Sequence, residues 1–214
     1  MNNRVASGFD FLAPWYDGLA RVFVGKDVVD AQLHFLKCFK ETKRLLILGG
    51  GSGWILEPLC LACPELQIDY IDLSPKMIEA ARIKSSNAQV TFIQGTENDI
   101  PDHSYDGLIT NFYLDLFDER SVGHVINKIR TSLTPSARWL VTDFVYEKRW
   151  HQLMLWIMYR FFRITACIEA TRLPDWQREM NHAGLTLLDS KNFKRGFIKS
   201  NLYRVATLNK YRNH

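Results

Sequence analysis

Residues 45–53 read Leu45-Leu46-Ile47-Leu48-Gly49-Gly50-Gly51-Ser52-Gly53, and this stretch decides the fold. The run of four branched apolar residues predicts a strand buried on both faces, which is typical of a parallel sheet. Glycines at alternate positions then let the backbone turn sharply and let a ligand approach it closely. The run from Trp54 to Leu59 predicts a helix, whose first amide groups favour negatively charged ligand groups. The stretch therefore predicts a strand, a ligand-binding turn and a helix.

The spacing of the glycines separates two ligand classes that use such a turn. A dinucleotide-binding fold has the pattern G-x-G-x-x-G, whose third glycine would fall at Trp54. The observed G-x-G-x-G instead resembles motif I of the class I S-adenosylmethionine-dependent methyltransferases. An ordinary turn between a strand and a helix could also carry such a cluster. The resemblance implies that the backbone of the turn contacts S-adenosylmethionine at Gly49, Gly50, Gly51 and Gly53.

Length and composition are those of a soluble globular protein. The chain has 214 residues, of which 47% are hydrophobic and 23% charged, and a formal net charge of +4. That charge neither requires nor excludes an anionic partner. No apolar run follows the start, so we expect no signal peptide, and four cysteines without a pairing pattern favour a reducing cytoplasm. We therefore expect one cytoplasmic domain over residues 1–214.

A second motif follows the next expected strand, residues 68–71. Asp72 ends this strand, 19 residues after Gly53. An acidic side chain at this point can accept hydrogen bonds from both ribose hydroxyls of an adenosyl ligand. The alternative is a solvated loop carboxylate. The setting D-x-S-x-x-M-I-x-x-A-R favours the ribose contact.

The residues after Asp72 predict the start of a helix. Ser74 is a typical N-cap, and Pro75 is favoured at the first helical position. The family resemblance implies that Leu73 lies beside the cofactor and that the Met77 thioether lies against the adenine.

The third expected strand, residues 90–94, leads into Gly95-Thr96-Glu97-Asn98-Asp99-Ile100-Pro101. This segment resembles the G-D-A-x-x-L-P segment of the family, which holds the adenine edge with a side chain and backbone amides. Thr96 stands where the family has aspartate, so the resemblance does not carry the side-chain contact to the adenine amine. The backbone contact at Glu97 is independent of its side chain. We therefore expect Gly95, Thr96 and Glu97 at the cofactor.

The fourth expected strand, residues 105–110, ends in polar residues. By the resemblance, Asn111 lies beside the methionine part of the cofactor, and Tyr113 and Asp115 face the acceptor substrate. The tetrad Asp/Asn-Pro-Pro-Tyr/Phe of enzymes that methylate DNA bases or glutamine amides is absent. This absence argues against an amide or adenine nitrogen as the acceptor.

The N-terminal residues 1–40 are expected to form a flap and a helix. The pattern F-D-x-x-A-P-x-Y-D over residues 9–17 resembles the start of the ubiquinone/menaquinone-biosynthesis methyltransferases. It implies that Tyr16 lies near the cofactor, while the alternative is an aromatic strap packed on the core. Apolar residues at helical spacing over residues 26–40 predict the helix that leads into the first strand.

The second half of the chain continues the alternation. We expect a helix over residues 119–133, a strand over residues 138–144, and a helix that begins near residue 173 and ends at Gly184. Strands over residues 185–193 and 202–208 complete an antiparallel hairpin. The fold predicted from this order is a doubly wound α/β, Rossmann-like sheet of seven strands in the order 3-2-1-4-5-7-6.

Residues 145–172 are the most individual part of the chain. Their apolar run from residue 150 is broken by arginines and is too short to span a bilayer, so we expect no stable membrane insertion. The family places substrate-covering helices here, which implies a lid rich in aromatic residues, with Trp150, Trp156 and Tyr159 as members. Core packing or a homodimer interface is the alternative.

The acceptor pocket is expected beyond the carboxyl ends of the fourth and fifth strands, where open α/β sheets bind ligands. Candidate catalytic residues there are His151, Asp143 and Tyr113. Histidine is the side chain that most readily exchanges a proton near neutral pH. A lone histidine at a helix start is also commonly an ordinary surface residue.

One departure from the family bears on activity. The family has an acid two residues before the first glycine, where this chain has Ile47. The favoured function is S-adenosylmethionine-dependent methylation of an apolar, quinone-like, phenolic or lipid-like small molecule. The alternatives are a cofactor-binding but inactive scaffold subunit and, less favoured, a nicotinamide-dependent oxidoreductase. The identity of the acceptor atom stays open.

We expect neither a metal nor a nucleic-acid partner. Cys60 and Cys63 form a C-x-x-C without a second ligand pair, because Cys38 and Cys167 are isolated in the sequence. Seven basic residues and no acidic ones follow from Lys191 onward, and a solvated basic edge explains them better than a nucleic-acid surface.

Overall fold

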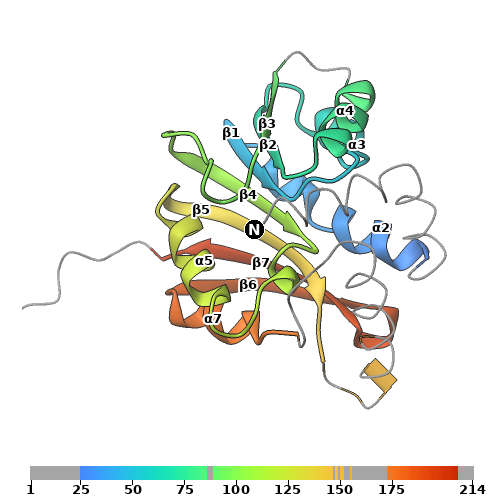
Figure 1. Cartoon of the computed structure of the whole chain (residues 1–214), viewed down its shortest axis with the longest axis vertical. Coiled ribbons are helices and arrows are strands. Elements are labelled where there is room, and N and C mark those ends of the chain that lie inside the picture. The colour runs from blue at the N-terminus through green and yellow to red at the C-terminus, as the bar shows by residue number, and fades with distance from the viewer. Residues whose placement is uncertain are drawn as a thin grey trace, which may run out of the picture.

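The structure, a computed structural model, describes residues 25–85, 89–146, 148, 150, 151, 155 and 173–206. Seven strands lie within these residues: β1 Arg44–Leu48, β2 Gln67–Asp72, β3 Val90–Gln94, β4 Tyr105–Asn111, β5 Leu133–Phe144, β6 Leu185–Phe193 and β7 Ile198–Val205. They form one sheet in the order β3-β2-β1-β4-β5-β7-β6 (Figure 1). The strands from β3 to β5 are parallel, and β7 is antiparallel to both of its neighbours. The expected sheet and C-terminal hairpin are confirmed.

The register of the parallel strands brings three predicted site residues to one edge. In β1, Leu48 pairs with Ile71 of β2 and with Thr110 of β4. The next residue along each strand is therefore at the same level. Because parallel strands end at the same edge of a sheet, the residues that follow these pairs gather there: Gly49, Asp72 and Asn111.

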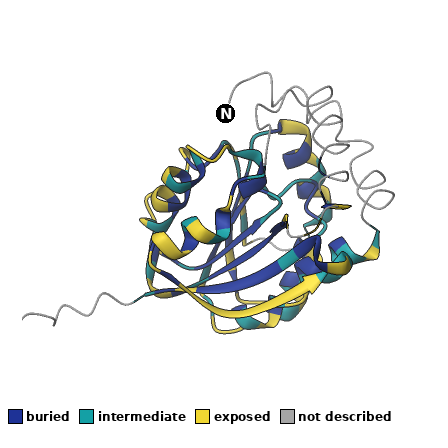
Figure 2. Ribbon diagram, turned by 90° about the horizontal axis from the view of Figure 1, so that it is seen from below, coloured by how far each residue is buried: buried dark blue, intermediate teal, exposed yellow. Residues whose placement is uncertain are grey.

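Helices cover both faces of the sheet, and the buried strands lie between them (Figure 2). One face carries the 3₁₀-helix η1 Leu36–Phe39 with α3 Leu56–Ala62 and α4 Pro75–Lys84. The other face carries α5 Val122–Arg130 and α7 Trp176–His182. A further helix, α2 Lys26–Leu33, contacts the hairpin strands β6 and β7. The layers are those of a three-layer α/β fold.

The alternation of side chains along β1 explains the two cores. Leu45 and Ile47 pack with the η1, α3 and α4 side, whereas Leu46 and Leu48 pack with the α5 and α7 side. All four are buried, as the continuous apolar run predicts. Burial of each such side chain contributes roughly 1.5–3 kcal/mol, so this strand is a strong organising element.

The expected helix over residues 26–40 is divided into two. α2 ends at Leu33, and η1 follows, with Cys38 N donating to the Phe35 carbonyl. Leu36 and Phe39 are both buried. A 3₁₀ turn places residues three apart on the same side, so both side chains reach the core from one short turn. The helix after the glycine turn also begins later than expected, at Leu56.

The second half differs from the prediction at its boundaries. α5 ends at Arg130 instead of residue 133, and β5 begins at Leu133, since Leu133 already pairs with β4. Ser136 has φ 68°, and the β4–β5 register shifts nearby. The last strand begins at Ile198, four residues before the expected start, because the hairpin turn is only η3 Lys194–Gly196.

Two expectations fall mainly outside the described residues. These are the N-terminal flap with Tyr16, and the lid over residues 145–172, where Trp156 and Tyr159 lie outside as well. Within residues 145–172, the structure describes only Val145, Tyr146, Lys148, Trp150, His151 and Leu155. Within the part of the chain that the structure describes, every helix falls short of the length and apolarity needed to cross a bilayer.

Candidate active site

The glycine turn after β1 has one glycine that borders open space. Gly49, Gly51 and Gly53 all have positive φ values, 64°, 66° and 78°, which glycine adopts without steric cost. A Cβ on Gly53 would lie 2.6 Å from the Cα of Ala81, so Gly53 allows α4 to pack closely. Within the described residues, a Cβ on Gly51 would meet no heavy atom within 4 Å. Among the glycines of this turn, Gly51 is therefore the one whose backbone the described residues leave open to a ligand.

Asp72 lies directly beside this open position. Its Oδ2 accepts a 2.8 Å hydrogen bond from Gly51 N, and its Oδ1 accepts a 2.9 Å bond from Ser74 N. A carboxylate can accept about four hydrogen bonds in all. The backbone bonds fix the carboxylate at the mouth of the turn, where the sequence predicted a ribose contact.

The helix start after Asp72 is confirmed. The Ser74 Oγ accepts a 3.2 Å bond from Met77 N, and Pro75 is the first residue of α4. Met77 is buried, with 2% of its surface exposed. The contacts of Met77 and Leu73 with adenine remain predictions.

The segment after β3 is closed by an internal turn. The Asp99 Oδ2 accepts a 2.8 Å bond from Thr96 N and lies 3.4 Å from the Thr96 hydroxyl. A Cβ on Gly95 would come within 2.6 Å of the Asp99 carboxyl, so glycine is required for this turn. Thr96 is buried and is used by its own turn. Asp99, which the sequence did not single out, is the residue that shapes this segment.

Tyr113 joins the segment after β4 to the segment after β3. Its hydroxyl donates a 2.7 Å hydrogen bond to the Glu97 Oε2, and both residues are buried. Its ring lies so close to Gly49 that a Cβ there would be 2.5 Å from Tyr113 Cδ2. Burial and the Glu97 charge raise the pKa of the Tyr113 hydroxyl well above its usual range. The Tyr113 ring therefore lies against the glycine turn, and its hydroxyl reaches the segment after β3.

Asn111 presents a buried acceptor to the same edge. Its Oδ1 is buried and, among the described residues, accepts no hydrogen bond. An unsatisfied buried acceptor costs about 1–3 kcal/mol, so such a group in a native structure calls for a ligand or water donor. The ammonium group of a methionine moiety is a donor of the right kind.

Two buried carboxyls, Asp115 and Asp143, lie beside the end of β5. The Asp143 Oδ2 accepts bonds from Leu114 N at 3.0 Å and Asp115 N at 3.3 Å, and its Oδ1 accepts from Phe144 N at 2.8 Å. Asp143 thereby holds η2 Leu114–Leu116 against β5. Burial raises the pKa of the Asp115 carboxyl to about 7, and burial with the nearby Asp115 charge raises that of Asp143. Both carboxyls are therefore harder to ionise than exposed aspartates.

His151 lies in an aromatic environment near the same edge. It is fully buried, which differs from the surface position that a lone histidine at a helix start often has. Its ring lies 5.3 Å from that of Phe197 and 4.3 Å from that of Trp150. Its Nδ1 accepts a 3.3 Å bond from Lys148 N, which places the proton of the neutral ring on Nε2.

Aromatic rings connect His151 to the end of β4. Phe112 follows Asn111 with φ 52°, a left-handed conformation that is uncommon for a bulky residue. The Phe112 and Phe144 ring centroids are 4.7 Å apart, and Phe144 and Phe197 are 4.9 Å apart. We call these residues the aromatic group: Phe112, Phe144, Trp150, His151 and Phe197. The sequence carries no signal that joins the three phenylalanines of this group, because they come from three separate segments.

The tip of the β6–β7 hairpin borders two hollows beside Trp150. One, of about 520 Å³, is lined by Asp27, Trp150, Lys194 and Arg195. The other, of about 410 Å³, is lined by residues that include Lys148, Lys191, Lys194 and Arg195. Lys194 and Arg195 both have positive φ, 47° and 55°, and the Arg195 carbonyl accepts a 3.2 Å bond from Lys148 Nζ. We call Lys148, Lys191, Lys194 and Arg195 the basic tip.

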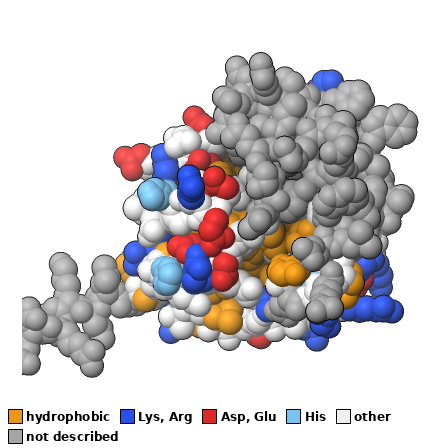
Figure 3. Space-filling model, turned by 60° about the horizontal axis from the view of Figure 1, so that its bottom comes forward, with side chains coloured by type: hydrophobic (Ala, Val, Ile, Leu, Met, Phe, Trp, Pro, Cys, Tyr) orange, Lys and Arg blue, Asp and Glu red, His pale blue; other side chains and the backbone are white. Residues whose placement is uncertain are grey.

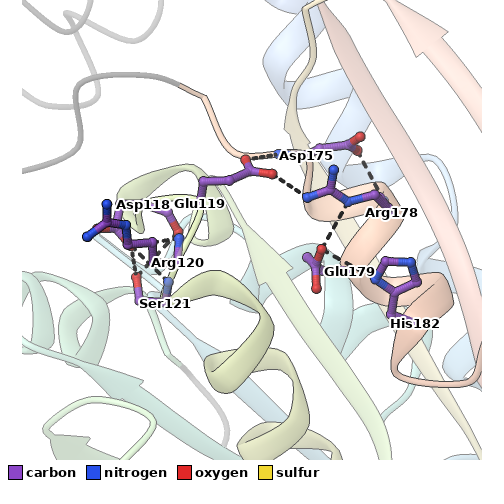
Figure 4. Close-up of polar contacts among 8 residues, drawn as sticks. All are labelled: Asp118, Glu119, Arg120, Ser121, Asp175, Arg178, Glu179 and His182. Atoms are coloured by element: carbon purple, nitrogen blue, oxygen red, sulfur yellow. Dashed lines mark hydrogen bonds and ion pairs between the residues drawn. The ribbon is translucent and has the colours of Figure 1, made fainter.

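A charged network lies on the outer side of α5 and α7, on a face where charges of both signs gather beside apolar surface (Figure 3). Glu119 accepts a 3.0 Å bond from Asp175 N and pairs with Arg178, which also pairs with Glu179 at 3.1 Å (Figure 4). The Asp175 Oδ1 caps α7 by accepting from Arg178 N at 3.1 Å. The network joins Glu119, just before α5, to the first turn of α7.

The described cysteines are not arranged as a metal site. Cys38, Cys60 and Cys63 form no disulfide, and no set of three His, Cys, Asp or Glu side chains within the described ranges is placed to hold a metal ion. Burial raises the pKa of Cys38 to about 12 and also raises that of Cys63. Thiols in such surroundings stay protonated and unreactive. Cys167 lies outside the described residues.

Comparison with known proteins finds similarity to methyltransferases over part of the chain. A family model described as a methyltransferase domain matches residues 45–136. The chain is 29% identical over 119 residues to malonyl-[acyl-carrier protein] O-methyltransferase 1 of Ilyobacter polytropus, covering 55% of this chain and 44% of that protein. It is 30% identical over 107 residues to the malonyl-[acyl-carrier protein] O-methyltransferase of Priestia megaterium, covering 50% and 38%. The chain thus spans less than half the length of these curated relatives.

Solved structures share the fold at low sequence identity. A chain of the complex between the Haloferax volcanii Trm112 methyltransferase activator and a putative methyltransferase superposes with a TM-score of 0.71 at 16% identity, covering 93% of this chain and 98% of that one. Human N-acetylserotonin methyltransferase, solved with its cofactor, gives 0.62 at 17% identity, covering 92% and 59%.

The glycine turn, the acid at the end of β2 and the sheet order agree with these matches. The match to a methyltransferase domain covers the segment that holds the glycine turn and the acid at the end of β2. The expected resemblance to the class I S-adenosylmethionine-dependent methyltransferases and the expected sheet order are confirmed.

Proposed function

We propose that this protein binds S-adenosylmethionine at the Gly51–Asp72 edge and transfers its methyl group to an apolar small molecule. The observation that carries the proposal is the open backbone of Gly51, beside a carboxylate held by two backbone amides. The buried Asn111 Oδ1 on the neighbouring strand adds an acceptor without a donor of its own among the described residues. The residues present fit the cofactor.

Each of these groups has a defined task. Asp72 would accept hydrogen bonds from the ribose hydroxyls, because its carboxylate is already oriented by Gly51 N and Ser74 N. Asn111 Oδ1 would accept from the ammonium group of the methionine moiety. The bound cofactor supplies an electrophilic methyl group on sulfur, and the protein positions the acceptor in line with it.

The aromatic group supports an apolar acceptor. Its rings lie at the carboxyl ends of β4 and β5, beside the cofactor edge, where open α/β sheets bind ligands. Apolar walls of this kind exclude water and hold a flat or aliphatic acceptor by its surface. His151, whose Nδ1 is held by Lys148 N, would donate from Nε2 to a polar atom of the acceptor and orient it.

The acceptor loses a proton when the new bond to carbon forms. Among the candidate residues, Asp143 is committed to three backbone amides and Tyr113 to Glu97. Neither is free to change partners without a structural change. A phenolic hydroxyl or an acidic carbon needs little assistance from a base, and Asp115, with its pKa near 7, is the described carboxyl best matched to accept a proton at neutral pH.

A direct experiment tests the proposal. Calorimetry with S-adenosylhomocysteine should show binding with one site per chain, and NAD should show none. Transfer of labelled methyl groups to a library of phenols, quinols and lipids should then reveal an acceptor. Binding without transfer to any compound would favour the inactive scaffold that Ile47 first suggested. Binding of NAD in place of S-adenosylhomocysteine would reject the methyltransferase site.

A second acceptor class is an acyl chain carried by an acidic protein. Two observations favour it: the relatives named above are malonyl-[acyl-carrier protein] O-methyltransferases, and Lys194 and Arg195 of the basic tip line a hollow together with Trp150. A negatively charged carrier could contact the basic tip while its acyl chain reaches the aromatic group. Positive charge near a site entrance attracts such a partner in a salt-dependent manner.

The two acceptor classes are separated by charge variants of the basic tip. The double change Lys194→Gln and Arg195→Gln should lower methyl transfer to a carrier-bound acyl substrate and leave transfer to a free small molecule unchanged. Lys37→Gln, an exposed lysine on η1, is the matched control. If the free compound is the only acceptor methylated, and the double variant is fully active, the carrier hypothesis is wrong.

A further inference from the structure

Tyr70 and Asp72, two residues apart on β2, bond to the same glycine from one strand. The Tyr70 hydroxyl donates a 2.9 Å hydrogen bond to the Gly51 carbonyl, and the Asp72 carboxylate accepts from Gly51 N at 2.8 Å. These atoms belong to the two peptide groups on either side of the Gly51 Cα. Both peptide planes are therefore held, and with them the positive φ of the open glycine.

The ring of Tyr70 fills the space beneath the turn. A Cβ on Gly50 would lie 2.1 Å from Tyr70 Cζ and 2.4 Å from its oxygen, so only glycine fits above the ring. Tyr70 is fully buried, and its ring centroid lies 5.3 Å from that of Phe92. A ring packed in this way has little freedom, so its hydroxyl is delivered to the Gly51 carbonyl at a fixed position.

The neighbouring strand β1 contributes no polar side chain at the point where it pairs with Tyr70. Ile47 of β1 pairs with Tyr70 in register and carries an apolar side chain that packs in the same buried cluster. The turn is tied to β2 instead, because Gly49 N and Gly50 N also donate to the Ile71 carbonyl, at 2.9 and 3.3 Å. Three consecutive residues of β2 thus determine the shape of the turn.

We propose that Tyr70 is a positioning residue for the cofactor: its hydroxyl holds the Gly51 carbonyl so that the turn keeps its ligand-binding shape. Tyr70 itself does not contact the ligand. In a chain whose β1 has isoleucine at this level, the tyrosine supplies the polar anchor from the neighbouring strand. This inference rests on the proposed cofactor site. It adds to that site a residue that neither the glycine motif nor the acid at position 72 would reveal.

The variant Tyr70→Phe removes one oxygen and keeps the ring. Loss of the bond lets the Gly51 peptide reorient, and the cofactor must then restore its conformation on binding. A typical hydrogen bond contributes an amount that corresponds to roughly a 3- to 10-fold change in affinity. We expect the dissociation constant for S-adenosylhomocysteine, measured by calorimetry, to rise by about this factor.

Tyr105→Phe is the matched control. Tyr105 is equally buried, in β4, and its hydroxyl donates a 2.7 Å hydrogen bond to Asp69 Oδ2 at the opposite, amino-terminal end of the sheet. The same atom is removed in both variants, so both should lower the melting temperature. Only Tyr70→Phe should weaken S-adenosylhomocysteine binding. Exchange of the Gly51 amide hydrogen should also accelerate in Tyr70→Phe alone.

The outcomes separate this inference from the proposed function. If the unmodified protein binds no S-adenosylhomocysteine, the cofactor site itself is rejected. If it binds, and Tyr70→Phe binds equally well despite a lowered melting temperature, Tyr70 is only part of the core and the inference is overturned. Should Tyr70→Phe fail to fold, Gly50→Ala displaces the same ring. Gly50→Ala should weaken S-adenosylhomocysteine binding relative to the control Gly123→Ala. A Cβ on Gly123 would come within 3.4 Å of the flexible Glu179 side chain alone among the described residues. Equal affinity of these two variants would also overturn the inference.

Discussion

The Tyr113 hydroxyl donates a 2.7 Å hydrogen bond to the Glu97 carboxylate, and this buried contact joins the segments after β3 and β4. These segments lie on either side of the ends of β1 and β2. The bond therefore holds together the two sides of the proposed cofactor site. The other oxygen of this carboxylate, Glu97 Oε1, accepts a 3.2 Å hydrogen bond from Asn98 Nδ2.

The first prediction concerns this bond. Tyr113→Phe leaves the buried Glu97 Oε2 without its donor, so we expect the free energy of unfolding to fall by about 1–3 kcal/mol at pH 7. Urea denaturation measures the change. Tyr146→Phe, at a tyrosine that is 54% exposed, should change stability little. Equal stability of Tyr113→Phe and the unmodified protein would show that the contact contributes nothing.

The second prediction concerns Asp72. Asp72→Asn removes the charge that would receive the ribose hydroxyls, and a charge-assisted hydrogen bond contributes about 1.5–3 kcal/mol. We expect S-adenosylhomocysteine to bind on the order of 10- to 100-fold more weakly in calorimetry. The control is Asp106→Asn at the opposite end of the sheet, where the carboxylate likewise accepts from two backbone amides, Lys43 N and Arg44 N. Equal weakening in both variants would point to a general loss of stability.

The third prediction is a pH dependence that arises from Asp115. Its pKa is raised from about 3.8 to about 7 in the folded protein, so the folded state binds more protons than the unfolded state between these values. The stability that this group contributes is present below pH 4 and is lost as the pH rises through 7. Asp115→Asn removes this titration.

The comparison is made by denaturation at several pH values. Relative to the unmodified protein, Asp115→Asn should gain stability as the pH rises from 4 to 8, by at most about 4 kcal/mol. Asp118→Asn is the control, because Asp118 is exposed and its hydrogen bonds with Ser121 lower its pKa instead. A difference between Asp115→Asn and the unmodified protein that does not vary with pH would contradict the raised pKa.

The fourth prediction concerns His151. If its Nε2 orients the acceptor, His151→Phe should preserve S-adenosylhomocysteine affinity and lower the kcat/KM for methyl transfer by roughly 10-fold, the equivalent of one hydrogen bond. His182→Gln, at a histidine whose side chain is 66% exposed, is the control. Unchanged transfer in His151→Phe, with the fold intact, would remove His151 from the acceptor pocket.

The sequence predicted the central part of the fold because its signals there are local. A buried strand, alternate glycines and an acid at a fixed distance occur within 30 residues, and the register brings Gly49, Asp72 and Asn111 together as expected. The helix boundaries were less accurate. Leu36 and Phe39 have helical spacing, but they reach the core from a separate 3₁₀ turn.

The contacts that the sequence did not predict are made between distant segments. The position of Tyr70 in a buried strand predicts an ordinary core residue. Only the structure shows that its hydroxyl donates a hydrogen bond to the Gly51 carbonyl. The roles of Asp99 and Glu97 are likewise visible only in the structure. Asp99 accepts a hydrogen bond from Thr96 N, and Glu97 accepts one from the Tyr113 hydroxyl. Asp143, expected in the acceptor pocket, also accepts hydrogen bonds from three backbone amide groups and so holds η2, which the sequence did not predict.

The measurement that tests the central claim most directly is calorimetry of the unmodified protein with S-adenosylhomocysteine and, separately, with NAD. The account predicts binding of S-adenosylhomocysteine with one site per chain and no binding of NAD, because Gly51 is open beside Asp72 and Trp54 stands where a dinucleotide fold has its third glycine. Binding of NAD without binding of S-adenosylhomocysteine would contradict it.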